Sequence, residues 1–122
     1  MKNILLVEDE EELITIVGTV FEEEGYTVKK SYSAEAALEL CESYQPDLII
    51  CDVKMGKMDG FMLLEKLKAS EKFKNVPFIF LTAFDEAQAR NKGLKLGAVA
   101  YIAKPFDVED LLKTVRQLVP PA

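Results

Sequence analysis

Short runs of apolar residues alternate with amphipathic stretches along the whole chain. Polar residues seldom interrupt the apolar runs, which is typical of strands buried on both faces of a parallel sheet. They predict strands at residues 3–7, 27–32, 47–51, 78–82 and 99–102. The second of these runs is more polar than the others, so we expect it to lie nearer an edge of the sheet.

Apolar residues recur at spacings of three and four between these runs, which predicts five helices. We expect Ser33, Asp85 and Asp107 to cap the second, fourth and last helices. Gly25 and Gly97 are suited to ending the first and fourth helices. The last helix has the most regular apolar face, formed by Val108, Leu111, Leu112, Val115, Leu118 and Val119.

Strict alternation of strands and helices predicts a parallel sheet covered by helices on both faces. The first, third and fourth strands are the most apolar and should occupy the centre of the sheet. The short connections leave no room for a second domain, so residues 1–119 are expected to form a single domain. Pro120 and Pro121 end helical order, and residues 120–122 would form a C-terminal tail or begin a linker.

The composition is that of a folded, acidic domain, with 49% hydrophobic residues and a net charge of -6. This charge argues against nucleic acid as a direct partner, because sequence-independent binding needs a basic surface. Cys41 and Cys51 are too few for a disulfide framework or a cysteine metal site and are interpreted as buried side chains in a reducing compartment. No apolar run is long enough to span a membrane and no signal peptide is evident, which predicts a cytoplasmic protein without membrane contact.

Polar side chains stand where the predicted strands end. They are Glu8 and Asp9 after the first strand, Asp52 after the third, Thr82 at the end of the fourth and Lys104 after the fifth. Ligands of open α/β sheets bind outside the carboxyl ends of the strands, where the strand order reverses. If the first and third strands are neighbours, the three carboxylates share one crevice and need positive charge to balance them. Lys104 and a hard divalent ion, Mg2+ rather than Ca2+, would supply that charge.

Asp52 is the candidate reactive group of this crevice. A carboxylate is already ionised near neutral pH and can act as a nucleophile without a general base. Phosphoryl transfer to it needs positioning and charge stabilisation, with little proton chemistry. The chain contains no histidine, which excludes imidazole as base, zinc ligand or phospho-carrier within it. Asp59, in contrast, is interpreted as the N-cap of the helix that begins at Gly60.

Taken in order, these residues resemble the receiver domain of bacterial two-component response regulators, such as the chemotaxis regulators. Glu8 and Asp9 lie within LLVEDE, Asp52 opens the pattern D-x-x-x-x-x-M-D-G, Thr82 precedes an alanine, and Lys104 lies within YIAKPF. The resemblance covers essentially the whole chain. It implies a flavodoxin-like, doubly wound α/β fold with five parallel strands in the order 2-1-3-4-5.

The resemblance also implies a phosphorelay function. Asp52 would accept a phosphoryl group from a phosphohistidine on a sensor histidine kinase or a histidine phosphotransfer protein. Asp9, Asp52 and the backbone carbonyl of Lys54 would bind Mg2+ directly, and Glu8 would act through a water molecule in the metal shell. Such a domain is a signalling protein and not an enzyme, because it catalyses only its own phosphorylation and dephosphorylation.

A conformational switch is implied by the same resemblance. Lys104 and Thr82 would hold the phosphoryl oxygens, and the bond between Lys104 and Pro105 would be cis. Movement of Thr82 toward the phosphoryl group would let Tyr101 turn inward and reshape the surface of the fourth helix, fifth strand and fifth helix. That surface would control an effector protein or a fused output domain, so the chain is either a stand-alone regulator or part of a longer one.

Several positions depart from the family pattern. Gly56 stands where proline is common, which suggests a more mobile loop. Lys54 and Phe84 lie two residues beyond Asp52 and Thr82, at positions that tune the lifetime of the phosphoryl group in the family. Residues 97–101 read GAVAY in place of GADDY, so the acidic pair that supports an active dimer is missing. We therefore expect a monomer or a weak dimer through the fourth helix, fifth strand and fifth helix.

Other functions fit parts of the pattern. A Mg2+-dependent phosphohydrolase would also form an aspartyl phosphate, but such enzymes usually have an acid where this chain has Lys54. A flavin or nucleotide carrier would need a phosphate-binding loop where residues 8–12 are all acidic. A constitutive docking domain would not need the full set of strand-end residues. Glu8 and Asp9 could also be ordinary first-turn helix acids, and Tyr101 an ordinary half-buried aromatic residue.

Overall fold

The computed structural model of the protein describes residues 1–84 and 86–121. Within them, five parallel strands form one sheet in the order β2-β1-β3-β4-β5. The strands are β1 (Asn3–Val7), β2 (Thr27–Ser31), β3 (Leu48–Cys51), β4 (Phe78–Thr82) and β5 (Ala100–Ala103). This is the predicted doubly wound fold, with β1, β3 and β4 at the centre and the polar β2 at an edge.

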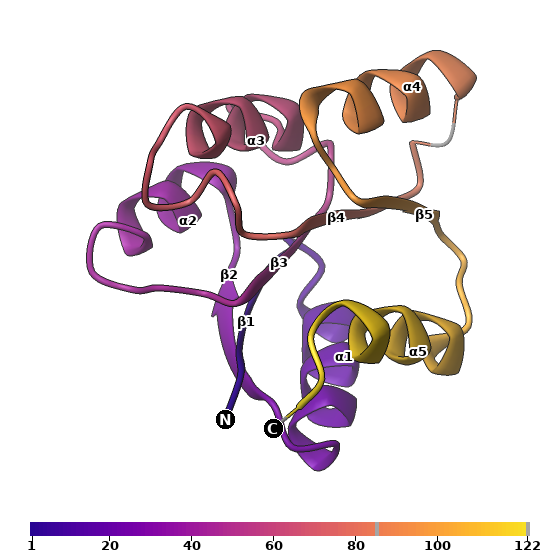
Figure 1. Cartoon of the computed structure of the whole chain (residues 1–122). Helices are drawn as coiled ribbons and strands as arrows, with labels where there is room; N and C mark the ends of the chain where they lie inside the picture. The colour runs from indigo at the N-terminus through magenta and orange to yellow at the C-terminus, as the bar shows by residue number, and fades with distance from the viewer. Residues whose placement is uncertain (85, 122) are drawn as a thin grey trace.

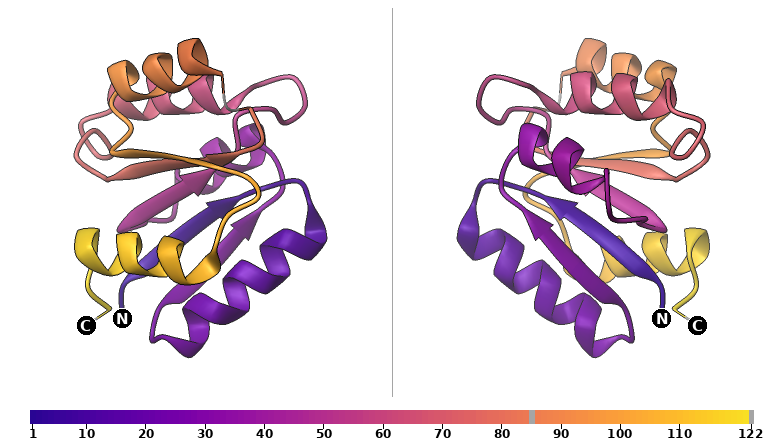
Figure 2. Two further views of the ribbon diagram at one scale, coloured as in Figure 1. Left: turned by 90° about the vertical axis from the view of Figure 1, so that its right-hand side faces the viewer. Right: turned by 90° about the vertical axis from the view of Figure 1, so that its left-hand side faces the viewer.

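The helices cover both faces of the sheet (Figures 1 and 2). They are α1 (Glu11–Glu23), α2 (Ala34–Leu40), α3 (Gly60–Lys68), α4 (Ala87–Leu96) and α5 (Val108–Leu118). α1 and α5 lie on one face, and α2, α3 and α4 lie on the other (Figure 2). The two chain ends lie close together, beyond the amino end of β1 (Figure 1).

Alternate residues of the central strands fill two separate hydrophobic layers. In β4, Phe78 and Phe80 belong to the layer under α2, α3 and α4, whereas Ile79 and Leu81 belong to the layer over α1 and α5. Every residue of β3 and β4 is buried, as expected for strands covered on both faces. Leu118 was expected on the apolar face of the last helix but is 39% exposed, and it is the last residue of α5.

Helix caps explain where several helices begin. The side-chain oxygens of Ser33, Asp59 and Asp107 accept hydrogen bonds from backbone N–H groups of α2, α3 and α5. The residue before α4 is Glu86, whose side chain makes no capping bond, and the expected cap Asp85 lies outside the described residues. α4 ends at Gly97 as predicted.

Some boundaries differ by one residue from the predicted ones. Asp47 precedes β3, and its carboxylate accepts the N–H of Asn3 at 2.7 Å, which ties this loop to β1. β2 ends at Ser31, before Tyr32, and β5 begins at Ala100, after Val99. Cys41 and Cys51 are buried free thiols, and burial raises the pKa of both. In the described part of the chain no helix has the length and apolar character needed to cross a membrane.

Candidate functional site

The candidate site lies where β1 and β3 end side by side. Val7 and Cys51 are partners in the register of these strands, so the residues that follow them leave the sheet at the same level. The N–H of Asp52 donates to the carbonyl of Val7 at 3.1 Å, which continues the pairing one step beyond β3. Glu8 is held in the same way, because its N–H donates to the carbonyl of Ser31 on β2 at 2.9 Å.

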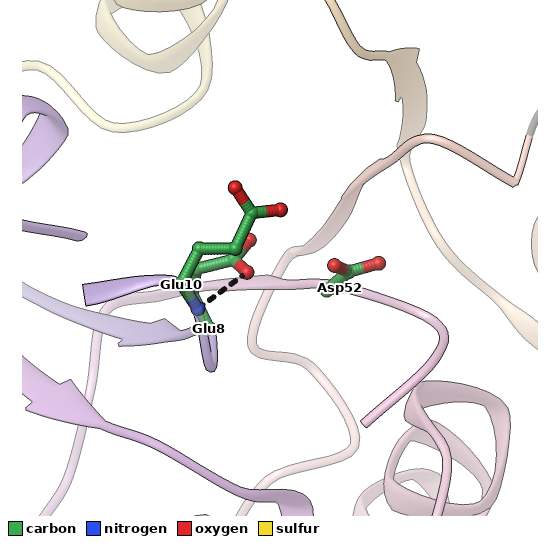
Figure 3. Close-up of side chains that lie close together, drawn as sticks. All are labelled: Glu8, Glu10 and Asp52. Atoms are coloured by element: carbon green, nitrogen blue, oxygen red, sulfur yellow. Dashed lines mark hydrogen bonds between the residues drawn. The ribbon is translucent and has the colours of Figure 1, made fainter. Parts of the chain in front are cut away.

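Three acidic side chains meet at this level, and we call them the carboxylate cluster. One carboxylate oxygen from each of Glu8, Glu10 and Asp52 lies within 4.8 Å of the others. Figure 3 shows Glu8 with its carboxylate directed toward Asp52, and Glu10 beside Glu8 with its carboxylate farther from the strand ends. Asp9, which the sequence pattern placed in the crevice, is exposed and is not one of the three. Glu10 was not predicted; the only signal for it is its place two residues after Glu8 in extended backbone.

Lys104 binds all three members of the carboxylate cluster. Its Nζ lies 2.8 Å from Glu8 Oε1, 3.1 Å from Glu10 Oε1 and 3.1 Å from Asp52 Oδ2. The backbone N–H of Lys104 donates to the carbonyl of Thr82 at 2.9 Å, which fixes this residue against the end of β4. The bond from Lys104 to Pro105 is cis, as the resemblance implied. Three carboxylates against one ammonium leave two negative charges for another cation to balance.

Burial and hydrogen bonding act in opposite directions on these groups. Burial raises the pKa of Glu8, while the hydrogen bonds from Lys104 and from the Glu10 N–H partly offset this rise. Burial lowers the pKa of Lys104, but its bonds to Glu8, Asp52 and Glu10 outweigh that effect and the net pKa is raised. Lys104 is therefore a cation near neutral pH, and Glu8 is a carboxylate whose ionisation is costly.

Asp52 is positioned by close backbone packing. Its Oδ1 accepts the N–H of Val53 at 2.6 Å, so one oxygen is fixed by the chain and the other faces Lys104. The first residue of α3 lies directly against it, since a Cβ on Gly60 would stand 2.3 Å from the Asp52 carbonyl oxygen. Glycine is therefore required at position 60 for β3 and α3 to approach this closely.

Thr82 and Tyr101 are joined through the loop that follows β4. Thr82 is buried, and its Oγ1 accepts the N–H of Phe84 at 3.1 Å. The hydroxyl of Tyr101 donates to the carbonyl of Phe84, and its ring packs on Phe80 with centroids 5.5 Å apart. Tyr101 is only 5% exposed, so it is a buried residue and its ring already lies inward in this structure.

A family model described as the response regulator receiver domain matches residues 4–116. The chain belongs to this family. Receiver domains are signalling modules, and they bind Mg2+ in their active sites. Response regulators are phosphorylated by histidine kinases and act on output domains or effector proteins.

Individual relatives of this receiver domain include whole regulators and single domains. Sporulation initiation phosphotransferase F of Bacillus subtilis is 30% identical, and the match covers 98% of this chain and 94% of that protein. The probable transcriptional regulator ycf29 of Porphyra purpurea is 36% identical, over 96% of this chain but 56% of that protein. The chain therefore spans about half the length of the transcriptional regulators that it matches.

Solved structures share the whole fold of this receiver domain. The chemotaxis response regulator CheY4 of Vibrio cholerae has a TM-score of 0.90 at 28% identity, covering 98% of this chain and 99% of that one. The receiver domain of a sensor histidine kinase from Pseudomonas aeruginosa has a TM-score of 0.86 at 29% identity, with 96% of each chain covered. That domain holds a magnesium ion coordinated in its active-site cleft.

The positions expected to tune phosphoryl lifetime are in contact in this receiver domain. The Nζ of Lys54 lies 4.2 Å from the centroid of the Phe84 ring, a cation–π distance. Gly56 has a φ of 58° and a Cβ there would meet nothing within 4 Å, so its backbone conformation and not crowding favours glycine. Proline could not adopt this φ, so the loop takes a different path from one with proline at position 56.

Proposed function

We propose that this receiver domain is a phosphorylation-controlled switch in which Asp52 accepts the phosphoryl group. The observation that carries the proposal is the pairing of a buried strand-end carboxylate, Asp52, with the ammonium of Lys104 at 3.1 Å. The donor would be a phosphohistidine on a sensor histidine kinase or a histidine phosphotransfer protein. A carboxylate oxygen of Asp52 attacks phosphorus, the P–N bond breaks, and the leaving imidazole keeps the bonding electrons and takes up a proton.

The residues around Asp52 are suited to Mg2+. Their donors are carboxylate and carbonyl oxygens, which this ion prefers, and the carboxylate cluster carries more negative charge than Lys104 balances. In our proposal Asp9, Asp52 and the carbonyl of Lys54 would hold the ion, and Glu8 would act on it through a water molecule. When bound, the ion supplies positive charge for the phosphoryl oxygens during transfer.

Lys104 and Thr82 would bind the phosphoryl oxygens once Asp52 is modified. In our proposal Thr82 moves toward the phosphoryl group to donate its O–H to a phosphoryl oxygen, and this movement draws its Oγ1 away from the Phe84 N–H that it accepts. Because Phe84 also accepts the hydroxyl of Tyr101, this movement would alter the loop against which Tyr101 packs. We propose that the change reaches the surface of α4, β5 and α5, where an effector, a fused output domain or a weak dimer contact would respond.

The proposed domain limits follow from the packing of the last helix. Val119 is buried and its carbonyl accepts the hydroxyl of Tyr26 at 2.6 Å. We therefore assign residues 1–119 to the receiver domain and residues 120–122 to a tail or the beginning of a linker.

Phosphoryl uptake by a single-residue variant tests this function. The protein is incubated with Mg2+ and acetyl phosphate, and intact-mass measurement follows the gain of one phosphoryl group. We expect uptake by the wild type and none by Asp52→Asn. Asp59→Asn is the matched control, since Asn also caps helices and Asp59 is assigned only to capping α3. Uptake that survives Asp52→Asn, or no uptake by the wild type, would contradict the proposal, and steady turnover of a phosphorylated metabolite would favour a hydrolase.

A further inference from the structure

All the hydrogen-bond donors of the Lys104 ammonium are in use. An ammonium has three N–H donors, and Lys104 directs them to Glu8, Glu10 and Asp52. A phosphoryl oxygen can therefore bind Lys104 only after one of these acceptors gives up its place. The identity of that acceptor affects how readily the phosphoryl group is bound.

Glu10 is the acceptor that can leave at the lowest cost. The Glu8 side chain is 3% exposed, and its second oxygen also accepts the N–H of Glu10 at 3.1 Å. Asp52 is the nucleophile, so its carboxylate must keep its place while a phosphoryl oxygen first reaches Lys104 during the transfer. The Glu10 side chain is 63% exposed, so its carboxylate regains water when it releases Lys104. Figure 3 shows its carboxylate farther from the strand ends than that of Glu8.

We propose that Glu10 is a positioning residue that holds Lys104 in the unphosphorylated domain and competes with the phosphoryl group for it. This inference rests on the proposed phosphorylation of Asp52. By occupying the third donor of Lys104, Glu10 slows phosphoryl uptake and weakens the binding of phosphoryl analogues. Its side chain makes no bond to the N-terminal N–H groups of α1, so holding Lys104 is the interaction that the structure assigns to it.

Two variants of Glu10 distinguish the effect of its side-chain length from the effect of its negative charge. Glu10→Gln removes the negative charge and leaves a weaker acceptor, whereas Glu10→Asp keeps the charge but is one methylene too short to reach Lys104 in this geometry. Asp is also favoured at an N-cap position, so this variant should remain folded. Glu12→Gln is the matched control, because it removes an exposed acid from the first turn of α1.

The first readout is the rate of phosphoryl uptake from acetyl phosphate at saturating Mg2+. We expect both Glu10 variants to react about two- to fivefold faster than the wild type, the factor that corresponds to one exposed ion pair. Glu12→Gln should react at the wild-type rate. The second readout is hydrogen exchange of the Lys104 ammonium without Mg2+, measured by NMR. It should be faster than in the wild type in both Glu10 variants and unchanged in Glu12→Gln.

Other outcomes would overturn the inference. A faster rate in both glutamine variants but not in Glu10→Asp would reveal a general effect of charge. A weaker Mg2+ affinity with no gain in rate at saturation would make Glu10 a metal ligand. If the wild type takes up phosphate and the Glu10 variants match it, only this inference fails. If the wild type takes up none, the proposed function fails as well.

Discussion

At the scale of single residues, the site is organised by the position of Lys104. Its ammonium contacts acidic side chains from two loops, and its side chain is only 12% exposed. Water at this buried position could therefore only poorly replace the positive charge that these acids need. Each buried carboxylate is stable in its place because this cation faces it. Removing this cation should therefore lower the free energy of unfolding by more than the loss of an exposed ion pair does.

Lys104→Met tests this balance. We expect it to lower the free energy of unfolding by about 3 kcal/mol near neutral pH without Mg2+, because Glu8 and Asp52 remain as unbalanced buried charges. Burial already raises the pKa of Glu8 above 4.5 in the folded protein, so its ionisation lowers stability as the pH rises through that range. This loss of stability in the variant should therefore shrink as the pH falls through the raised pKa of Glu8, because the protonated side chain carries no charge that Lys104 must balance.

Urea unfolding at several pH values measures this deficit. Lys113→Met is the control, since Lys113 is exposed on α5 and should contribute little. A deficit that is absent near neutral pH, or that grows on acidification, would show that Lys104 does not balance the buried acids.

At the scale of elements, the site depends on how closely the end of β3 and the beginning of α3 approach. We expect Gly60→Ala to destabilise the protein by about 1–3 kcal/mol, since its Cβ would overlap the Asp52 carbonyl and the Phe80 ring. It should also slow phosphoryl uptake by displacing Asp52. Gly18→Ala is the contrasting variant: in mid-helix its Cβ meets the flexible end of Lys30, and alanine favours the helix. Equal stability of the two variants in thermal unfolding would refute this account.

The end of α5 is held by the turn before β2. The Tyr26 hydroxyl donates to the carbonyl of Val119, and Arg116 pairs with Glu24. We expect Tyr26→Phe to cost about 1 kcal/mol near neutral pH, the usual value of one hydrogen bond. Burial raises the pKa of Tyr26 above 10.0 in the folded protein, so above pH 10.0 the unfolded chain ionises before the folded one. The free energy of unfolding of the wild type then falls, and its difference from that of Tyr26→Phe should narrow.

Tyr44 provides the comparison for Tyr26. Its hydroxyl is buried and has no hydrogen-bond partner among the described residues. Tyr44→Phe should therefore leave stability unchanged or raise it, because no bond is lost and a buried polar group is removed. Chemical denaturation of both variants gives the comparison; a larger loss for Tyr44→Phe would contradict these hydrogen-bond assignments.

At the scale of the whole molecule, the parallel topology explains why so much of the site follows from the sequence. Apolar runs ending in Glu8, Asp52 and Thr82 predict a crevice, because parallel strands share one carboxyl edge. The role of Glu10 was missed, because the partner that brings its side chain into the site, Lys104, lies 94 residues away in the sequence. The contact of Lys54 with Phe84 likewise joins two loops whose paths no local pattern determines.

Switching is also a property of the whole molecule. On addition of Mg2+ and beryllofluoride, we expect the largest amide NMR shifts outside the site to fall on α4, β5 and α5. The reason is that the loop at Phe84 links Thr82 to Tyr101. Asp52→Asn should abolish these shifts. Shifts concentrated on α2 would place the responsive surface elsewhere.

Identification of the modified residue tests the central claim most directly. The wild-type protein is phosphorylated with acetyl phosphate and Mg2+, digested, and mapped by tandem mass spectrometry. We predict one phosphoryl group, on Asp52, in the peptide that contains residues 49–60. A phosphoryl group on any other residue with Asp52 unmodified would contradict the account.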